Sequence, residues 1–152
     1  NEPGVLARVI GLFSGRGYNI ESLTVAAVTE DESMSLITIV TTGTPMIIEQ
    51  IRNQLDRLIP VESVKDLTLE GPHVERELAM VKVVTKAKSP ERAEILRLAE
   101  IFGAIAVDTT TRSFVFAMTG LPDKVDSFVG LMRELGKTKI ARSGVVAIAR
   151  GA

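Results

Sequence analysis

The stretch NEPGVLARVIGLFSGRGYNIESLTV, residues 1–25, decides the first fold element and the first candidate site. Pro3 and Gly4 signal a turn, and the apolar residues that follow recur at helical spacing, which predicts a helix over residues 4–16. Two further glycines end this helix, and residues 18–29 are typical of a strand. A helix N-terminus behind a glycine turn presents free N–H groups and a partial positive charge, which suits a carboxylate or a phosphate.

A polar side chain follows the same helix. Asn19 lies where the chain returns from the helix, so we expect its amide to reach the spot that the Gly4 turn creates. This arrangement suits a small anion beside a polar side chain and contains no chemistry for breaking a bond. From the residues alone, Gly4 could also be a simple turn glycine and Asn19 a plain turn residue. A dinucleotide loop is disfavoured, because the glycines lie within and after the helix rather than before it.

Residues 1–70 follow the order helix, strand, strand, helix, strand. One strand placed before Asn1 would complete βαββαβ, the split βαβ order of ferredoxin-like folds. We therefore expect an apolar, β-branched strand upstream of Asn1. A targeting peptide upstream of Asn1 is also compatible with the sequence. After the first strand, the expected elements are a strand over residues 35–42, a helix from Pro45 that Pro60 ends, and a strand over residues 61–69.

The same order recurs after a polar segment that contains Gly71 and Pro72. We interpret residues 71–77 as a linker between a first domain over 1–70 and a second over 78–152. The fold class is therefore α+β, with two βαββαβ modules, and the open sheet edges of such modules predict a partner. The expected second-module elements are a strand over 78–85, a helix capped by Ser89, a hairpin of 105–110 and 113–119, a helix from Pro122 to Gly136, and a strand over 140–149.

Composition excludes several classes of function. Eighteen basic and nineteen acidic residues leave a formal charge of −1, which gives no electrostatic basis for binding nucleic acid or an anionic membrane. The absence of cysteine excludes disulfides, thiolate zinc sites and a cysteine nucleophile. No apolar run approaches the roughly 20 residues that span a bilayer.

Isolated charged residues give weaker signals. His73 is the only histidine, and a lone histidine in a polar segment favours a surface or packing role over catalysis or metal binding. The acidic run over residues 30–32 is typical of a solvated hairpin loop. Arg142 and Arg150 flank an apolar strand and could form a partner-facing patch or be ordinary solvated arginines.

A series of motifs runs along nearly the whole chain. They are Asn1, Gly4, Arg8-Val9, Gly11-Leu12-Phe13, Arg16-Gly17, Tyr18-Asn19-Ile20 and Ser22-Leu23, and then His73 to Val83, Glu100 to Phe102, Asp108 and Ile140 to Arg150. In this order the motifs resemble the regulatory (small) subunits of acetolactate synthase, also called acetohydroxyacid synthase, whose N-terminal module is an ACT domain. Leu36 and Gly103 stand where this family leads us to expect arginines.

The resemblance implies a non-catalytic regulatory subunit in branched-chain amino acid biosynthesis, without catalytic or metal-binding residues of its own. It would raise the activity of a catalytic large subunit, confer feedback inhibition by valine, and form a homodimer through its ACT domains. Thiamine diphosphate, magnesium and FAD would belong to the large subunit, and the location would be bacterial cytoplasm or a plastid. The implied effector residues are Asn1, Gly4, Val5, Leu6, Asn19, Ile20, Leu23 and Val25.

Three alternatives remain: an ACT-domain amino-acid sensor for another enzyme, a small ferredoxin-like hydrolase, and an RNA-binding module. RNA-recognition domains stack bases on strand aromatics, and only Phe114 and Phe116 lie within an expected strand. We expect no effector site in the second module, because the turn Lys86–Pro90 has no glycine and no matching asparagine. A chain ending near Gly71 should then keep most effector binding.

Overall fold

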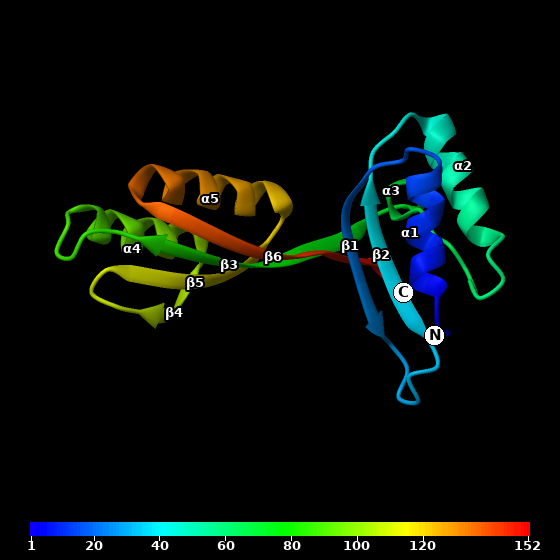
Figure 1. The fold of residues 1–152 in the computed structure, drawn as a ribbon, viewed down its shortest axis with the longest axis horizontal. Helices are drawn as coiled ribbons and strands as arrows, with labels where there is room; N and C mark the ends of the chain where they lie inside the picture. The colour runs from blue at the N-terminus through cyan, green and yellow to red at the C-terminus, as the bar shows by residue number, and fades with distance from the viewer. The chain divides into compact units, whose positions relative to one another are not determined.

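The computed structural model describes residues 1–152, which divide into two compact units. Unit 1 comprises Asn1–Val74 together with Val145–Ala152, and unit 2 comprises Glu75–Gly144. Both combine helices with antiparallel strands, which confirms the α+β class (Figure 1). No helix in the chain has the length and apolar character needed to cross a membrane.

Unit 1 is built from a helix, a two-stranded hairpin and a second helix, in the expected order. Phe13, Val9 and Ile51 form its buried core, and Ile37 and Ile39 pack against them. Thr44 accepts a hydrogen bond from the backbone N–H of Ile47 and so caps the second helix, whose first residue is a proline. The elements are α1 (Val5–Gly15), β1 (Ile20–Ala27), β2 (Ser35–Thr41) and α2 (Pro45–Asp56).

The prediction of a strand over residues 61–69 is wrong. Residues 61–66 are irregular, and Leu67–Glu70 forms the short helix α3, which Asp66 caps by accepting a hydrogen bond from the N–H of Thr68. In a βαββαβ module the last strand pairs with the first, and no strand precedes α1 among the described residues. The segment pairs with no described strand, and local side-chain capping orders its last residues.

The boundaries expected from the sequence also differ from the observed units. Most of the expected linker over 71–77 is strand, because β3 (His73–Val84) begins there. Residues 145–152, which we placed in the second domain, belong to unit 1. Val145 explains this grouping: its N–H donates to Ser22 Oγ, and its carbonyl accepts from Thr24 Oγ1, both at 3.4 Å.

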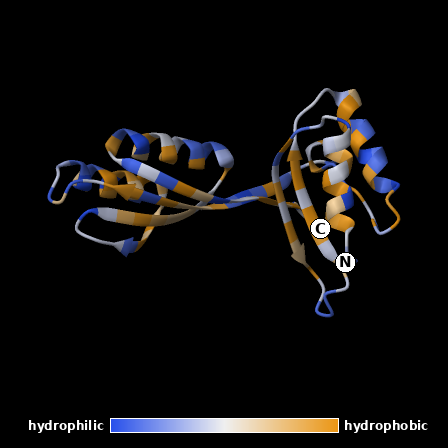
Figure 2. Cartoon of the chain, viewed as in Figure 1, coloured by the Kyte–Doolittle hydropathy of each residue, from blue (hydrophilic) through white to orange (hydrophobic).

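Unit 2 holds the complete βαββαβ order. Its strands lie in the order β4-β5-β3-β6, so the first and third strands of the module are central, as in ferredoxin-like folds. Both helices alternate polar and apolar faces (Figure 2). The elements are β3, α4 (Glu91–Phe102), β4 (Ile105–Thr109), β5 (Ser113–Gly120), α5 (Pro122–Leu135) and β6 (Lys137–Ala149).

Strict alternation along the central strands creates the core of unit 2. Alternate residues of β3 and β5 are buried, and the helices α4 and α5 pack on this face of the sheet. Phe114 and Phe116 lie in this core, 2% and 1% exposed, and are therefore not available to stack on bases. The largest fully buried side chains of the unit are Phe116, Phe128, Ile95, Met132, Val81, Val83 and Val125.

The N-terminal cap of α4 differs from the one that we expected. The C-terminal end of α4 explains why glycine stands at position 103, where we expected an arginine. The residue at the N-cap is Pro90 rather than Ser89, and no side chain caps the helix. Gly103 ends α4 with a φ of +68°, a conformation that glycine adopts without the Cβ penalty of other residues. An arginine at this position would be strained, so glycine suits this particular helix end.

Candidate functional site

The Gly4 turn presents free backbone donors, as expected. Gly4 has a φ of +81° and precedes α1 without a capping side chain. The N–H of Val5 bonds to the carbonyl of Glu2 at 3.4 Å, whereas the N–H groups of Leu6 and Ala7 have no acceptor in the protein. A Cβ built on Gly4 would meet no atom within 4 Å, so the space beside the turn is open. The turn can therefore accept a small anion.

Asn19 does not share this spot in a single chain, so our interpretation that its amide reaches the Gly4 turn is wrong. Asn19 follows the C-terminal end of α1, and Gly4 precedes its N-terminal end. An eleven-residue helix at about 1.5 Å per residue separates them by roughly 16 Å. The backbone carbonyl of Asn19 accepts a hydrogen bond from Thr41 Oγ1, and its exposed amide has no partner in the protein.

Asn1 lies at the Gly4 end of the helix. Its Nδ2 donates to the carbonyl of Glu32 at 2.9 Å, and its backbone nitrogen donates to the carbonyl of Ser33 at 2.7 Å. Both acceptors belong to the turn between β1 and β2, which therefore anchors the start of the chain. Asn1 and Gly4 thus form one half of the expected site, and Asn19 with Ile20 forms the other half.

The expected apolar residues fall into two environments. Val5 and Ile20 pack against the core of unit 1, so each has a structural role. Leu23 pairs with Ile39 across the hairpin, which directs it toward the helices, and it is half-buried. Two side chains remain accessible for an aliphatic ligand at 37% and 44% exposure: Leu6 and Val25.

The acidic turn over residues 30–32 orders the hairpin through hydrogen bonds of its own. Asp31 accepts hydrogen bonds from the hydroxyl and the backbone N–H of Ser33, at 2.7 Å and 3.1 Å. Chiefly the hydroxyl bond from Ser33 lowers the pKa of Asp31 from 3.8 to about 2. No group of three or more histidine and acidic side chains in the chain is placed to hold a metal ion.

An ion pair in unit 2 was missed by the sequence analysis. Arg142 donates to Glu77 and, at 2.5 Å, to Asp126, so it forms neither a free patch nor a plain solvated charge. The hydrogen bond with Glu77 is the main reason that the pKa of Arg142 is raised. The alternation along β3 could have revealed it, because Glu77 lies on the same face of the strand as the buried residues Ala79 and Val81.

Comparison with known proteins covers both modules. Residues 1–63 match the family described as AHAS small subunit-like ACT domain, and residues 76–151 match the family described as Small subunit of acetolactate synthase. The chain is 46% identical over 152 residues to the acetolactate synthase isozyme 3 small subunit of Salmonella typhimurium, covering 99% of this chain and 91% of that protein.

The chain belongs to the acetolactate synthase small-subunit family. A probable acetolactate synthase small subunit of Archaeoglobus fulgidus is also 46% identical, over 99% of this chain and 92% of that one. The crystal structure of the small subunit from Thermotoga maritima superposes with a TM-score of 0.85 at 35% identity, covering all of this chain and 92% of that one. Membership supports a regulatory role in branched-chain amino acid biosynthesis and implies a catalytic large subunit as partner.

Proposed function

We propose that this small subunit activates the catalytic large subunit of acetolactate synthase and confers feedback inhibition by valine. The Gly4 turn carries the proposal, because it combines unbonded N–H groups, a helix N-terminus and open space. The chain itself binds no cofactor in this proposal, and thiamine diphosphate, magnesium and FAD belong to the large subunit.

The chemistry of the turn suits a small amino acid. The effector's carboxylate accepts hydrogen bonds from the N–H groups of Leu6 and Ala7, where the helix dipole also attracts negative charge. Its aliphatic side chain packs on exposed apolar groups such as Leu6 and Val25. An asparagine amide, which carries both a donor and an acceptor, serves the ammonium group and the carboxylate together.

The effector site is completed by a second copy of the chain. Asn19 lies roughly 16 Å from Gly4 along α1 in one copy, so one chain supplies only half of the polar groups. In the proposed twofold pair of ACT modules, the Asn19 end of one α1 lies beside the Gly4 end of the other, an arrangement that a self-complementary interface permits. An edge of the β1–β2 sheet provides backbone groups for this pairing.

Binding at this seam then couples to catalysis by favouring one arrangement of the paired modules. The large subunit responds only if it distinguishes that arrangement from others. Such couplings are typically ~1–3 kcal/mol, which changes the apparent effector affinity several-fold or more.

Co-purification with an acetolactate synthase large subunit tests the proposal, with activity measured with and without valine. We expect complex formation, a rise in activity and loss of part of that activity when valine is added. Activation without any valine response would reject valine as the effector. Failure to bind or activate a large subunit, combined with amino-acid binding, would instead favour a sensor for another enzyme.

A further inference from the structure

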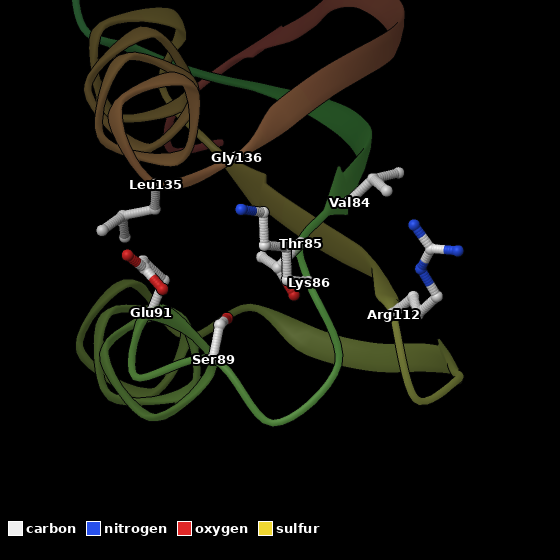
Figure 3. A pocket seen from close by; sticks show the side chains of 8 residues that line it. All are labelled: Val84, Thr85, Lys86, Ser89, Glu91, Arg112, Leu135 and Gly136. Carbon is white, nitrogen blue, oxygen red and sulfur yellow. The ribbon is translucent and has the colours of Figure 1, made fainter.

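A cleft of about 410 Å³ lies at one end of unit 2 and belongs to neither the proposed valine site nor unit 1. It opens between the loop from β3 to α4 and the junction of α5 with β6 (Figure 3). Small-molecule pockets commonly enclose about 300–1,000 Å³. We propose that this cleft binds a small zwitterionic α-amino acid. The lining residues are Val84, Thr85, Lys86, Ser89, Glu91, Arg112, Leu135 and Gly136.

Two hydroxyl groups in the cleft wall lack partners. Thr85 is 9% exposed, and its Oγ1 has no hydrogen bond in the protein. The Oγ of Ser89, on the same loop, is likewise buried and unpaired. Buried polar atoms in native proteins are nearly always bonded, so these two exceptions on one wall mark where water or another polar molecule binds. Each oxygen has almost no solvent-accessible surface, so its side chain must change rotamer before it can donate to, or accept from, a ligand in the cleft.

The charged groups of the cleft suit a zwitterion. Figure 3 shows Lys86 extending its ammonium group into the hollow, toward the side where Glu91 and Leu135 lie. No ion pair joins Lys86 to Glu91, so each charge is available to a ligand. Arg112 points away from the hollow in the same view. Lys86 therefore binds the carboxylate, Glu91 binds the ammonium group, and Leu135 contacts a short aliphatic side chain.

Two backbone features explain how the cleft forms although the β3–α4 turn contains no glycine. Lys88 adopts a φ of +56° and supplies the left-handed residue of the β3–α4 loop. Gly136 supplies close approach on the facing wall, because a Cβ built there would lie 2.4 Å from the carbonyl oxygen of Val84. We expected no site at Lys86–Pro90 because that turn contains no glycine, whereas the glycine that permits close approach lies about fifty residues later in the chain.

Titration of the ¹⁵N-labelled full chain with L-alanine, L-valine, lactate and inorganic phosphate tests the proposal by NMR. We expect saturable shifts of the amide resonances of residues 85–89, 91 and 136 with at least one of the two amino acids. Lactate has a hydroxyl in place of the ammonium group, so it should bind at least about tenfold more weakly, the size of effect expected for losing a charge-assisted hydrogen bond.

Three variants and one control variant sharpen the test. Lys86→Met should weaken amino-acid binding at least about tenfold, whereas Lys88→Met, on the same loop but outside the lining, should not change it. Glu91→Gln should reduce the preference for the amino acid over lactate. Thr85→Val should raise the melting temperature of the free chain and reduce the further rise that the amino acid produces, because the unpaired hydroxyl is gone.

Three results would overturn the proposal: no shift around the cleft with either amino acid at millimolar concentration, equal binding of phosphate and amino acid, or equal effects of Lys86→Met and Lys88→Met. Resonances of residues 4–7 report separately on the proposed valine site. A Gly4→Asp chain should lose those shifts and keep the shifts around the cleft, so failure at one site is distinguishable from failure at the other.

Discussion

Arg142 and Glu77 are joined by an ion pair between β6 and β3, and the carboxylate side chain is only 4% exposed. The two residues stand 65 positions apart in the chain. Arg142 also donates to Asp126 on α5, so one guanidinium links two strands and a helix of unit 2. Removing it would leave the Glu77 carboxylate buried without its cation.

Arg142→Met should therefore lower the free energy of unfolding by about 2 kcal/mol, measured by urea denaturation at neutral pH. This value is below the cost of breaking a fully buried pair, because the Arg142 side chain remains 33% exposed. Arg97→Met is the matched control, since Arg97 pairs with Glu94 on an exposed helix surface and should cost less than about 0.5 kcal/mol. Equal losses in the two variants would contradict this assignment.

Gly136→Ala should destabilise the chain by about 2–3 kcal/mol, because the new methyl group would collide with the backbone carbonyl of Val84. Its φ of −176° is open to any residue, so collision rather than dihedral strain is the cause. Gly120→Ala is the control: its Cβ would meet the flexible end of Lys124 at 3.0 Å, and we expect a loss below about 1 kcal/mol. Thermal unfolding of both variants measures the difference.

The turn between β1 and β2 should loosen in acid. Asp31 has a lowered pKa of about 2, so its contribution to folding is complete above about pH 4 and is lost as the pH falls toward 2. An NMR titration of the Asp31 carboxyl carbon should give a midpoint near 2. Ser33→Ala removes the largest cause of the shift and should move the midpoint toward 3.8. A wild-type midpoint near 4 would show that the network does not form in solution.

Gly4→Asp should abolish valine inhibition and leave activation of the large subunit largely intact. The added carboxylate occupies the helix N-terminus where the effector carboxylate binds, and aspartate tolerates the left-handed conformation better than most residues. Gly4→Ala tests the dihedral strain without the charge and should retain more inhibition. Asn19→His should also cause resistance, because it removes the paired donor and acceptor of the amide. Valine titration of the reconstituted enzyme measures all three.

Mixing the Gly4→Asp and Asn19→His chains should restore part of the inhibition. If each site uses Gly4 of one copy and Asn19 of the other, mixed dimers carry one intact site, so about a quarter of all sites recover. Subunit exchange before the assay is required. No recovery after proven exchange would place both residues in one chain's site or outside the site.

A chain ending at Gly71 should be less stable than unit 1 within the full chain. It lacks Val145, which bonds to Ser22 and Thr24. This result would limit effector binding by the truncated chain, contrary to our expectation from the sequence. Hydrogen exchange of β1 amides should be faster in the truncated chain than in the full chain. Equal protection would mean that the terminal segment contributes nothing.

Most elements were predictable because their residues carry local signals. The helix from Pro122, with Val125 and Phe128 inward, and the hairpin through Phe114 follow from periodicity and turn residues alone. The prediction of a strand over residues 61–69 was wrong because a strand needs a neighbouring strand to pair with, and apolar periodicity does not show whether one is present. The prediction that Ser89 caps α4 was wrong by one position, because Pro90 occupies the N-cap.

The candidate site was predicted in its parts but not in its assembly. The Gly4 turn follows from local sequence, and its free N–H groups are present. Asn19 follows the C-terminal end of α1, so the eleven residues of the helix separate it from Gly4. The cleft in unit 2 depends on residues from both ends of the module, such as Lys86 and Gly136, and no local pattern relates them.

The division of unit 1 into two stretches of sequence has a consequence for synthesis. Unit 2 is continuous, so all of its residues are available as soon as Gly144 has left the ribosome. Unit 1 needs residues 145–152, the last part of the described chain to be made, although its other residues are made first. The nascent chain therefore cannot form the hydrogen bonds between Val145 and the β1 hydroxyls of Ser22 and Thr24 until the whole of unit 2 has been made.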